Sequence, residues 1–326
     1  CFNCIVIIDY DIIILGGKLM LGAIIGDIVG SVYEWNNIKT KEFKFFRDDC
    51  FFTDDTVMTI AVGKAIYDSD KDIDRLKEII VPTLQYIGRP YPNSGYGGRF
   101  YAWMYTDNPQ PYNSYGNGAA MRVSACGFVA DSLEEAKELS KIVTEISHNH
   151  PEGIKGAEAT TVAIYMARHG ASKNEIREYI GEYYYDLNFT IDGIRSSYKF
   201  NETCQRTVPQ SIVAFLESTD FEDAIRNAIS IGGDSDTLAA ITGSIADAYY
   251  GVPQDLKDKA IAYLDDRLLN LFDEFHDKYM TNRLGIELLE EAINDILPGL
   301  AMYVRDVNLD PKLAAIYEPG MIIMER

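Results

Sequence analysis

Two acidic clusters, residues 53–56 and 234–237, each stand directly before a run of apolar residues. After the first cluster, Val57, Ile60 and Ala61 recur at the spacing of a buried helix face. Adjacent carboxylates at the start of a buried helix repel one another unless something cationic lies between them. The chain must therefore fold so that two buried concentrations of negative charge are compensated.

Helix capping is the simpler interpretation of each cluster taken alone. Thr53 can act as an N-cap, which places Asp54 and Asp55 in the first turn, where carboxylates interact favourably with the helix dipole. By the same reasoning Asp234 or Ser235 can cap the second helix. This interpretation leaves the second carboxylate of each cluster unexplained, because capping needs a single acceptor.

Metal binding is the alternative interpretation of the two clusters. All their side chains offer hard oxygen atoms, which suit Mg²⁺ or Mn²⁺ better than zinc. The cations nearest in sequence are too distant to be adjacent partners: Arg47, Lys64 and Arg226. If the clusters meet in space, they predict a two-metal site and a hydrolase, with arginines from elsewhere in the chain as the competing source of positive charge.

Composition excludes several classes of partner. The chain has 326 residues and a formal net charge of −20, which repels nucleic acid and anionic membrane surfaces. Five cysteines form no paired framework, and their odd number indicates a reducing compartment, so we expect a cytoplasmic protein. The apolar stretch 4–15 contains two aspartates and is too short to span a bilayer.

Helical periodicity covers most of the chain, and strand signals are few. Apolar residues recur at helical spacing over 54–67, 73–87, 133–147, 154–169, 221–230, 236–250 and 255–272. The stretch 236–250 is rich in alanine, glycine and serine, which predicts tight packing at the centre of a bundle. We expect one all-α domain whose irregular segments, 88–118 and 183–207, gather on one side.

The ends of the chain differ from this pattern. Residues 1–19 are interpreted as an extension ahead of the natural start, because a cleaner pattern opens at Met20. The tail after about residue 283 is predicted to be helical to about Leu297 and mixed beyond it.

Three further motifs have both a structural and a functional interpretation. The segment Gly26–Ser31 reads as a helix with small residues at a close crossing, in which Asp27 is a buried hydrogen-bonding residue. The glycine-rich segment 114–122 could receive phosphates on its backbone N–H groups, or simply form a turn before a helix. His148 and His150 could bind a transition metal, line a ligand site, or belong to a polar loop at a helix end. Six tyrosines could form an aromatic wall: Tyr91, Tyr96, Tyr101, Tyr105, Tyr112 and Tyr115.

Taken together, five motifs in this order resemble the ADP-ribosylglycohydrolase family, which includes the dinitrogenase-reductase-activating glycohydrolase and the ADP-ribosylhydrolases. The motifs are GDIVGSVYE, FTDDT, YGNGAAMR, SHNHPEGIKGA and GGDSDTLAAITGSIADAYYG. The resemblance runs from about Met20 to about Phe272. It implies a compact orthogonal helical bundle with a binuclear Mg²⁺ or Mn²⁺ centre in a cleft.

The resemblance also assigns residues by position. It implies that the metal ligands are Thr53, Asp54, Asp55, Asp234, Asp236 and Thr237. It places Glu34 near the metals, where it gates or assists catalysis. The residues implied for the phosphates and ribose are Gly116, Asn117, Gly118 and Met121. His148 matches a histidine near the distal part of ADP-ribose.

The reaction implied is hydrolysis at C1″ of ADP-ribose linked to a protein or a small acceptor, through an oxocarbenium-like transition state. Two metals could bind the ribose hydroxyls and orient a water, from which Glu34, Asp55 or Asp234 could take a proton. The acceptor linkage, which could be to arginine, serine, an O-acetyl group or nucleic acid, is left open. Two other functions compete with this one: a non-catalytic ADP-ribose binder or structural relative, and a different metal-dependent hydrolase such as a phosphoesterase.

Overall fold

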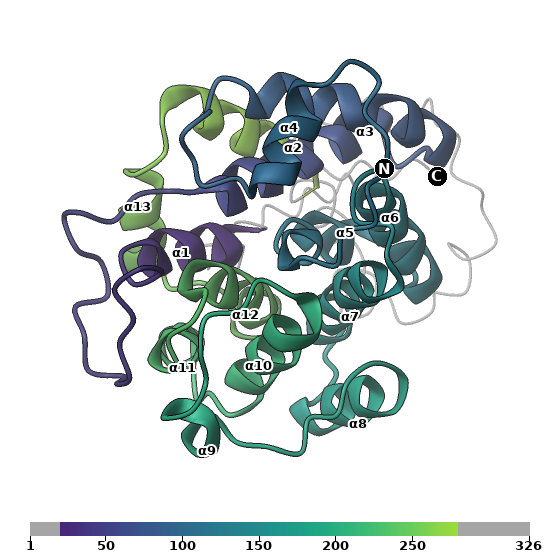
Figure 1. Ribbon diagram of the computed structural model, residues 1–326. Helices are drawn as coiled ribbons and strands as arrows, with labels where there is room; N and C mark the ends of the chain where they lie inside the picture. The colour runs from purple at the N-terminus through teal and green to yellow at the C-terminus, as the bar shows by residue number, and fades with distance from the viewer. Residues whose placement is uncertain (1–19, 280–326) are drawn as a thin grey trace, which may run out of the picture. The chain divides into compact units, whose positions relative to one another are not determined.

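Helices make up nearly all the regular structure of residues 20–279, the part of the chain that this computed structural model describes (Figure 1). The elements are α1 (Leu21–Ser31), α2 (Asp54–Ser69), α3 (Ile73–Gly88), α4 (Gly98–Tyr105), the 3₁₀ turn η1 (Asn117–Ala119), α5 (Ser124–Val129), α6 (Leu133–Glu145), α7 (Pro151–Arg168), α8 (Lys173–Tyr183), α9 (Ile191–Arg195), α10 (Cys204–Leu216), α11 (Phe221–Ser230), α12 (Ser235–Tyr250) and α13 (Gln254–Ile261). A further helix covers 266–279. Within these residues the β-structure is limited to one isolated bridge, between Gly116 and Thr203. The predicted all-α class is confirmed.

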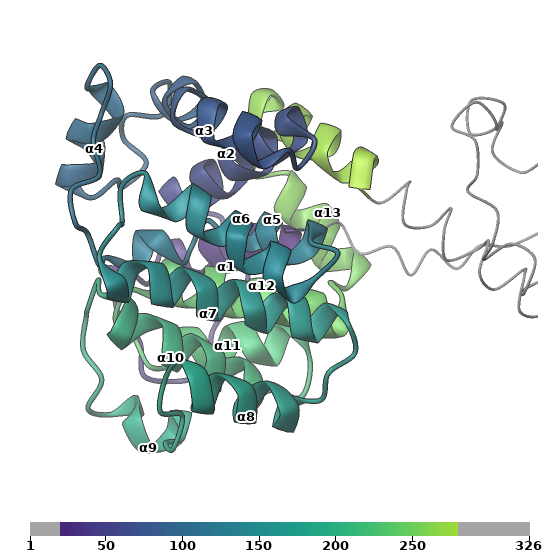
Figure 2. The ribbon, with the colours of Figure 1, turned by 90° about the vertical axis from the view of Figure 1, so that its right-hand side faces the viewer.

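Helices α1 and α12 cross at very close range in the interior of the bundle (Figures 1 and 2). A Cβ atom on Gly26 would lie 2.0 Å from the backbone oxygen of Ala239, and one on Gly30 would lie 2.5 Å from Cα of Asp236. Every residue of α1 is buried, as are Ser235–Asp247 of α12. The sequence interpretation of both small-residue segments is confirmed, and the crossing brings the middle of α1 to the start of α12.

A buried carboxylate fixes the start of α2 on α1. Asp27 accepts hydrogen bonds from the Thr53 N–H at 2.8 Å and the Thr56 N–H at 3.0 Å, and from both hydroxyl groups. The Thr53 side chain in turn accepts the Asp55 N–H at 3.3 Å, as an N-cap does. Hydrogen bonds to a charged group contribute about 1.5–3 kcal/mol each. Asp27 therefore holds the start of α2 against α1.

The predicted single helix over 255–272 is wrong. The structure has α13 over Gln254–Ile261, a turn, and a second helix over 266–279. The Asp265 carboxylate accepts the Leu268 N–H at 2.9 Å, so it caps the second helix. An aspartate that satisfies a free N–H group starts a new helix more readily than it continues an old one.

The two segments expected to be irregular also contain helices. Helix α4 lies within 88–118, and α9 and the start of α10 lie within 183–207. Helix α4 buries Phe100, Trp103 and Met104 on one face. It has only two turns, and α9 is shorter still, so neither offers enough repeats for a periodic signal. The predicted extension 1–19 and the predicted tail helix lie outside the described residues.

Two observations bear on the expected surroundings of the protein. The three cysteines among residues 20–279, Cys50, Cys126 and Cys204, are free and buried. No helix in that range combines the length and the apolar character needed to cross a membrane.

Candidate active site

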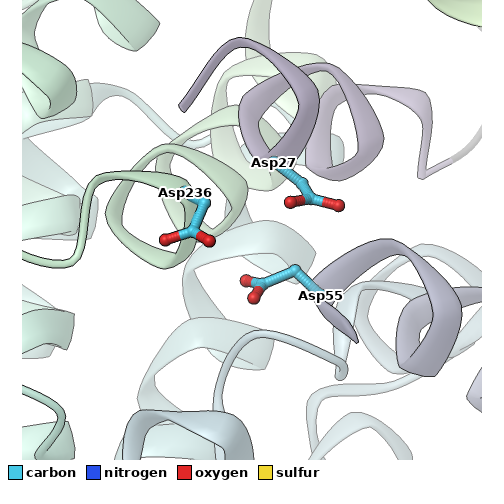
Figure 3. A group of neighbouring side chains, drawn as sticks. All are labelled: Asp27, Asp55 and Asp236. Atoms are coloured by element: carbon cyan, nitrogen blue, oxygen red, sulfur yellow. The ribbon is translucent and has the colours of Figure 1, made fainter. Parts of the chain in front are cut away.

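The two acidic clusters meet, because α2 and α12 begin close together. The Thr237 hydroxyl donates a hydrogen bond to Asp55 Oδ2 at 3.2 Å across 182 positions of sequence. Figure 3 shows Asp27, Asp55 and Asp236 pointing toward one another from α1, α2 and α12. Each of these three buried carboxylates offers an oxygen within 4.8 Å of the other two. The condition set by the sequence, that the clusters be neighbours, is therefore met.

A second carboxylate group adjoins the first. Glu34, Asp234 and Asp236 also offer oxygens that lie within 4.8 Å of one another. Asp234 occupies the N-cap position of α12, but its side chain makes no capping bond and instead accepts a hydrogen bond from Asn117 Nδ2 at 2.6 Å. We call the combined group the acidic centre: Asp27, Glu34, Asp55, Asp234 and Asp236. The capping interpretation thus holds for Thr53 and is wrong for the Asp234 side chain.

Burial makes the negative charge of the acidic centre costly. It raises the pKa values of Asp55 and Asp236, and the neighbouring carboxylates raise them further. The pKa of Asp27 rises to about 6 through burial, against the opposing effect of its hydrogen bonds from Thr53 and Thr56. Burial, followed by Asp234, raises the pKa of Glu34 to about 7, while a hydrogen bond with the Trp35 side chain lowers it. These carboxylates need a compensating cation in order to stay ionised together.

Within residues 20–279 no lysine or arginine makes direct contact with the acidic centre, although the charge of Arg122 acts on Asp54 without an ion pair. The three candidates nearest in sequence pair elsewhere: Arg47 with Asp49, Lys64 with Asp68 and Glu274, and Arg226 with Glu222. Across the same residues, no lysine or arginine forms an ion pair with a carboxylate of the acidic centre.

One buried oxygen atom is left without a partner. Asp55 Oδ1 is fully buried and accepts no hydrogen bond, although the other oxygen of the same carboxylate is bonded by Thr237. Leaving such an oxygen unpaired costs about 1–3 kcal/mol, and more when the group is charged, unless a ligand satisfies it. An all-oxygen donor set with an unsatisfied carboxylate atom fits a hard divalent cation.

The implied ligands differ in how they are engaged. Asp54, Asp55, Asp234, Asp236 and Thr237 line a common cavity. The Thr53 hydroxyl donates its proton to Asp27 Oδ1 at 2.6 Å, which holds α2 on α1 and leaves an oxygen lone pair for a ligand. Asp27 is the member of the acidic centre to which the sequence interpretation gave only a buried hydrogen-bonding role. The signal that could have revealed it is its position directly after Gly26, where α1 crosses α12.

The acidic centre opens into a cavity of about 270 Å³. Its walls come from the loop after α1, the starts of α2, α4 and α12, and the turn η1. The predicted site residues that line it are Glu34, Asp54, Asp55, Gly116, Asn117, Gly118, Met121, His148, Asp234, Asp236 and Thr237. Sequence reasoning had not assigned its remaining walls, which include Arg99, Phe100, Arg122 and Glu202. The fold therefore gathers distant motifs around one space.

The segment 116–118 divides this cavity. Asn117 faces the acidic centre through its bond to Asp234, whereas a Cβ on Gly116 or Gly118 would lie 3.6 or 3.5 Å from His148 Nε2. The next helix begins only at Ser124, and the Asn117 N–H already donates to the Glu202 backbone oxygen at 2.8 Å. A side chain at 116 or 118 would therefore pack against the histidine, and part of the backbone expected for phosphate binding is already in use.

Positive charge collects on the other side of that segment. Arg122 is fully buried, donates to the Val143 backbone oxygen and the Ser147 hydroxyl, and lies over the Phe100 ring at 5.3 Å. Its Nε atom has no partner. Burial lowers its pKa to about 10, so it stays charged at neutral pH.

Two more residues complete this region, and we call Arg99, Arg122 and His148 the arginine end of the cavity. Arg99 donates to the Tyr112 backbone oxygen at 2.6 Å and lies over the Tyr112 ring. Burial, then Arg122 and Arg99, lower the pKa of His148 well below its usual value, so that its ring is neutral. Neither arginine forms an ion pair with a carboxylate within residues 20–279. This end is suited to an anion.

Two sequence interpretations gain little support. Among residues 20–279 no candidate metal group includes a histidine, and the His150 ring accepts the Glu152 N–H at 3.0 Å as the cap of α7. Of the six tyrosines, Tyr112 lines the cavity and the others do not. Tyr91, for example, donates to Asp265 instead.

Comparison with known proteins shows which family this chain resembles. The sequence profile described as ADP-ribosylglycohydrolase matches residues 17–285. The ADP-ribosylhydrolase ARH3 of Homo sapiens is 24% identical over 72% of this chain and 85% of its own length. The ADP-ribosylarginine hydrolase Tri1 of Pseudomonas putida is 29% identical over 42% of this chain and 39% of its own.

A solved structure agrees with these sequence matches. A chain of an ADP-ribosylglycohydrolase-related protein complex superimposes with a TM-score of 0.57 at 19% identity, covering 79% of this chain and 95% of the other. This similarity shows the fold, and the family profile covers most of the sequence. The chain therefore belongs to the ADP-ribosylglycohydrolase family and is a glycosidic-bond hydrolase.

Proposed function

We propose that this enzyme releases ADP-ribose from an acceptor by hydrolysing the C1″ bond, and that its acidic centre holds two Mg²⁺ or Mn²⁺ ions. The observation that carries the proposal is the unpartnered Asp55 Oδ1 among buried carboxylates that no cation of residues 20–279 compensates. Hard oxygen donors at two adjoining groups suit two such ions. The residues proposed to hold them are Thr53, Asp54, Asp55, Asp234, Asp236 and Thr237.

When bound, the ions would supply Lewis-acid stabilisation to the ribose hydroxyls and to the attacking water. Glu34 is the proposed general base. It lines the cavity and lies within 4.8 Å of Asp234 and Asp236, without being one of the proposed metal ligands. Asp55 accepts a hydrogen bond from Thr237, and Asp234 accepts one from Asn117. We assign both carboxylates to holding the metal ions, with proton transfer as the alternative role.

The arginine end is proposed to bind the diphosphate and the distal part of the substrate. Arg122 and Arg99 carry positive charge without a carboxylate partner in the described chain, and guanidinium groups bind phosphate oxygens well. Gly116 and Gly118 line the cavity beside His148, and Asn117 contacts the acidic centre through Asp234. The cavity thereby orients the substrate, with its ribose at the acidic centre.

The direct test measures free ADP-ribose released from an ADP-ribosylated peptide in the presence of Mg²⁺. Release that stops on chelation, and returns with Mg²⁺, is expected. A second readout does not depend on turnover: Mg²⁺ should raise the melting temperature of the substrate-free protein. Tight binding of ADP-ribose without release would favour the non-catalytic binder.

A further inference from the structure

Two consecutive glycines with left-handed backbone stand directly before Asp234. Gly232 and Gly233 have φ angles of 63° and 85°, a region that glycine adopts without the steric cost that other residues meet. The Asp234 side chain makes no capping bond that would fix it to the first turn of α12. Contacts from outside this turn must therefore help to place the Asp234 carboxylate in the acidic centre.

Asn37, on the loop after α1, makes such a contact. Its Oδ1 accepts the Gly233 N–H at 2.6 Å, and its Nδ2 donates to the Gly233 carbonyl oxygen at 2.9 Å. A Cβ atom on Gly232 would lie 3.0 Å from the same Oδ1. The amide of Asn37 thus pairs with both backbone polar groups of the residue that precedes Asp234.

The same amide holds the segment that carries Glu34. Asn37 Nδ2 also donates to the backbone oxygens of Tyr33 at 2.8 Å and Glu34 at 2.7 Å. Its N–H groups therefore serve carbonyl oxygens on two segments, the farther of which is 196 residues away in sequence. Glu34 and Asp234 belong to the second carboxylate group, whose oxygens lie within 4.8 Å of one another. One side chain thus ties together the main chain beside both carboxylates.

A lysine of the same loop fastens the other end of the turn. Lys39 donates to the Tyr198 backbone oxygen at 2.7 Å and to that of Ile231, which comes directly before the two glycines. Asn37 itself is exposed and does not line the cavity. Replacing an exposed residue normally changes stability little. Four hydrogen bonds on one exposed amide are therefore better explained by the placement of the turn than by the stability of the fold.

We propose that Asn37 is a positioning residue, which sets the separation of Glu34 and Asp234 and thereby shapes the second carboxylate group. This inference rests on the proposed function, in which Glu34 moves a proton and Asp234 helps to hold a metal ion. The four hydrogen bonds described above all run to the backbone, and none of them reaches α2, which carries Asp55. Loss of Asn37 should therefore disturb the second carboxylate group more than the first.

Two measurements test this role, and one of them does not depend on turnover. Titration calorimetry of the metal-free, substrate-free protein with Mn²⁺ should show two binding events in the wild type. In Asn37→Ala one event should weaken about 10- to 100-fold, the range for losing a residue that orients a metal ligand, while the other changes far less. At saturating Mn²⁺, kcat for ADP-ribose release should also fall about 10- to 100-fold. KM should change little, because Asn37 does not line the cavity.

Three controls separate positioning from damage to the fold. Asn36→Ala removes the neighbouring exposed amide, which does not line the cavity, and should behave as wild type in both measurements. Asn37→Asp keeps the shape and the acceptor for Gly233 but turns the donor into an oxygen that faces carbonyl oxygens. It should be impaired at least as much as Asn37→Ala, whereas a role in filling space would spare it. Without metal, Asn37→Ala should melt within about 2 °C of the wild type.

The outcomes distinguish the two levels of the proposal. If the wild type binds no Mn²⁺ and releases no ADP-ribose, the proposed function fails and the positioning role fails with it. If the wild type does both, and Asn37→Ala matches Asn36→Ala in either measurement, the function stands and the positioning role is overturned. Equal weakening of both Mn²⁺ events, together with a lower Tm of the metal-free protein, would also overturn it, because it would indicate general loosening of the fold.

Discussion

The two sides of the cavity are charged in opposite senses, and neither is neutralised within the described chain. The acidic centre concentrates carboxylates on three helices, while the arginine end holds a fully buried arginine without a carboxylate partner. A chain with a net charge of −20 has no general shortage of anions for an arginine. This distribution of charge supports the proposal that each side binds a ligand of opposite charge.

The two sides also differ in how they can relieve their own charge. Buried carboxylates can take up protons, and the pKa values of Asp55 and Asp236 are raised accordingly. Arg122 has a pKa of about 10 and cannot lose its proton near neutral pH. Without ligands, the acidic centre is therefore expected to become partly neutral, whereas the arginine end keeps its charge.

The largest expected effect comes from removing a proposed metal ligand on the acidic side of the cavity. Asp54→Ala or Asp236→Ala should keep the helical fold and lower the rate of ADP-ribose release at least about 10²- to 10³-fold, as loss of one electrostatic catalytic group does. Initial rates and circular dichroism measure both. Asp74→Ala, which removes an exposed carboxylate of α3, is the matched control. A wild-type rate in either variant would count against the metal-binding role.

Removing the metal ions should impair the acidic side of the cavity. Exhaustive chelation should abolish release, and adding Mg²⁺ at about 100 times its Kd should raise stability by about 2.7 kcal/mol, or several degrees in Tm. Calorimetry or dye-monitored melting checks this. Asp236→Ala should lose most of the Mg²⁺ response. Full activity after chelation would contradict the two-metal proposal.

Removing the charge of the arginine end should weaken binding rather than catalysis. Arg122→Met keeps most of the side-chain volume and should raise the Kd for ADP-ribose about 10- to 100-fold, the range for loss of a charge-assisted hydrogen bond. Titration calorimetry measures the Kd. Chemical denaturation should show a loss of unfolding free energy smaller than the loss of binding free energy, because only two neutral acceptors, the Val143 backbone oxygen and the Ser147 hydroxyl, lose a donor. Arg177→Met, which removes the hydrogen bond from this α8 side chain to the Leu187 backbone oxygen, is the control. An unchanged Kd would remove the arginine end from the substrate site.

The smallest effect should be the pH dependence of the metal-free protein. His148 has a folded pKa below its unfolded value, so its contribution to stability is present above about pH 6.5 and is lost as pH falls. The acidic centre has raised pKa values and the opposite sign, so it loses stability as pH rises. In chelated protein, His148→Gln should therefore gain Tm relative to wild type as pH falls from 7 to 5.5. A difference in Tm that does not vary with pH would contradict this assignment.

Much of the site could be predicted from local sequence. The α2 start at Thr53 follows from a hydroxyl ahead of an apolar helix, and the small residues of α1 and α12 indicated a close crossing. The helices at α4 and α9 could not be predicted in the same way, because two turns or fewer carry little periodic signal. The break between α13 and the helix over 266–279 was not predicted either. Asp265 starts the second helix, but the apolar pattern continues on both sides of it.

The sequence by itself determined the all-α class, the order of the family motifs and the chemistry of the two acidic clusters. Only the tertiary structure decided that Asp27 joins them, that Arg122 lacks a carboxylate partner in residues 20–279, and that Asn37 ties the main chain beside Glu34 to the turn before Asp234. The physical reason is one of range. Caps and helical faces depend on residues a few positions apart, whereas charge compensation and contacts between distant segments depend on where helices cross. In this chain the glycine-lined crossing of α1 and α12 sets those positions.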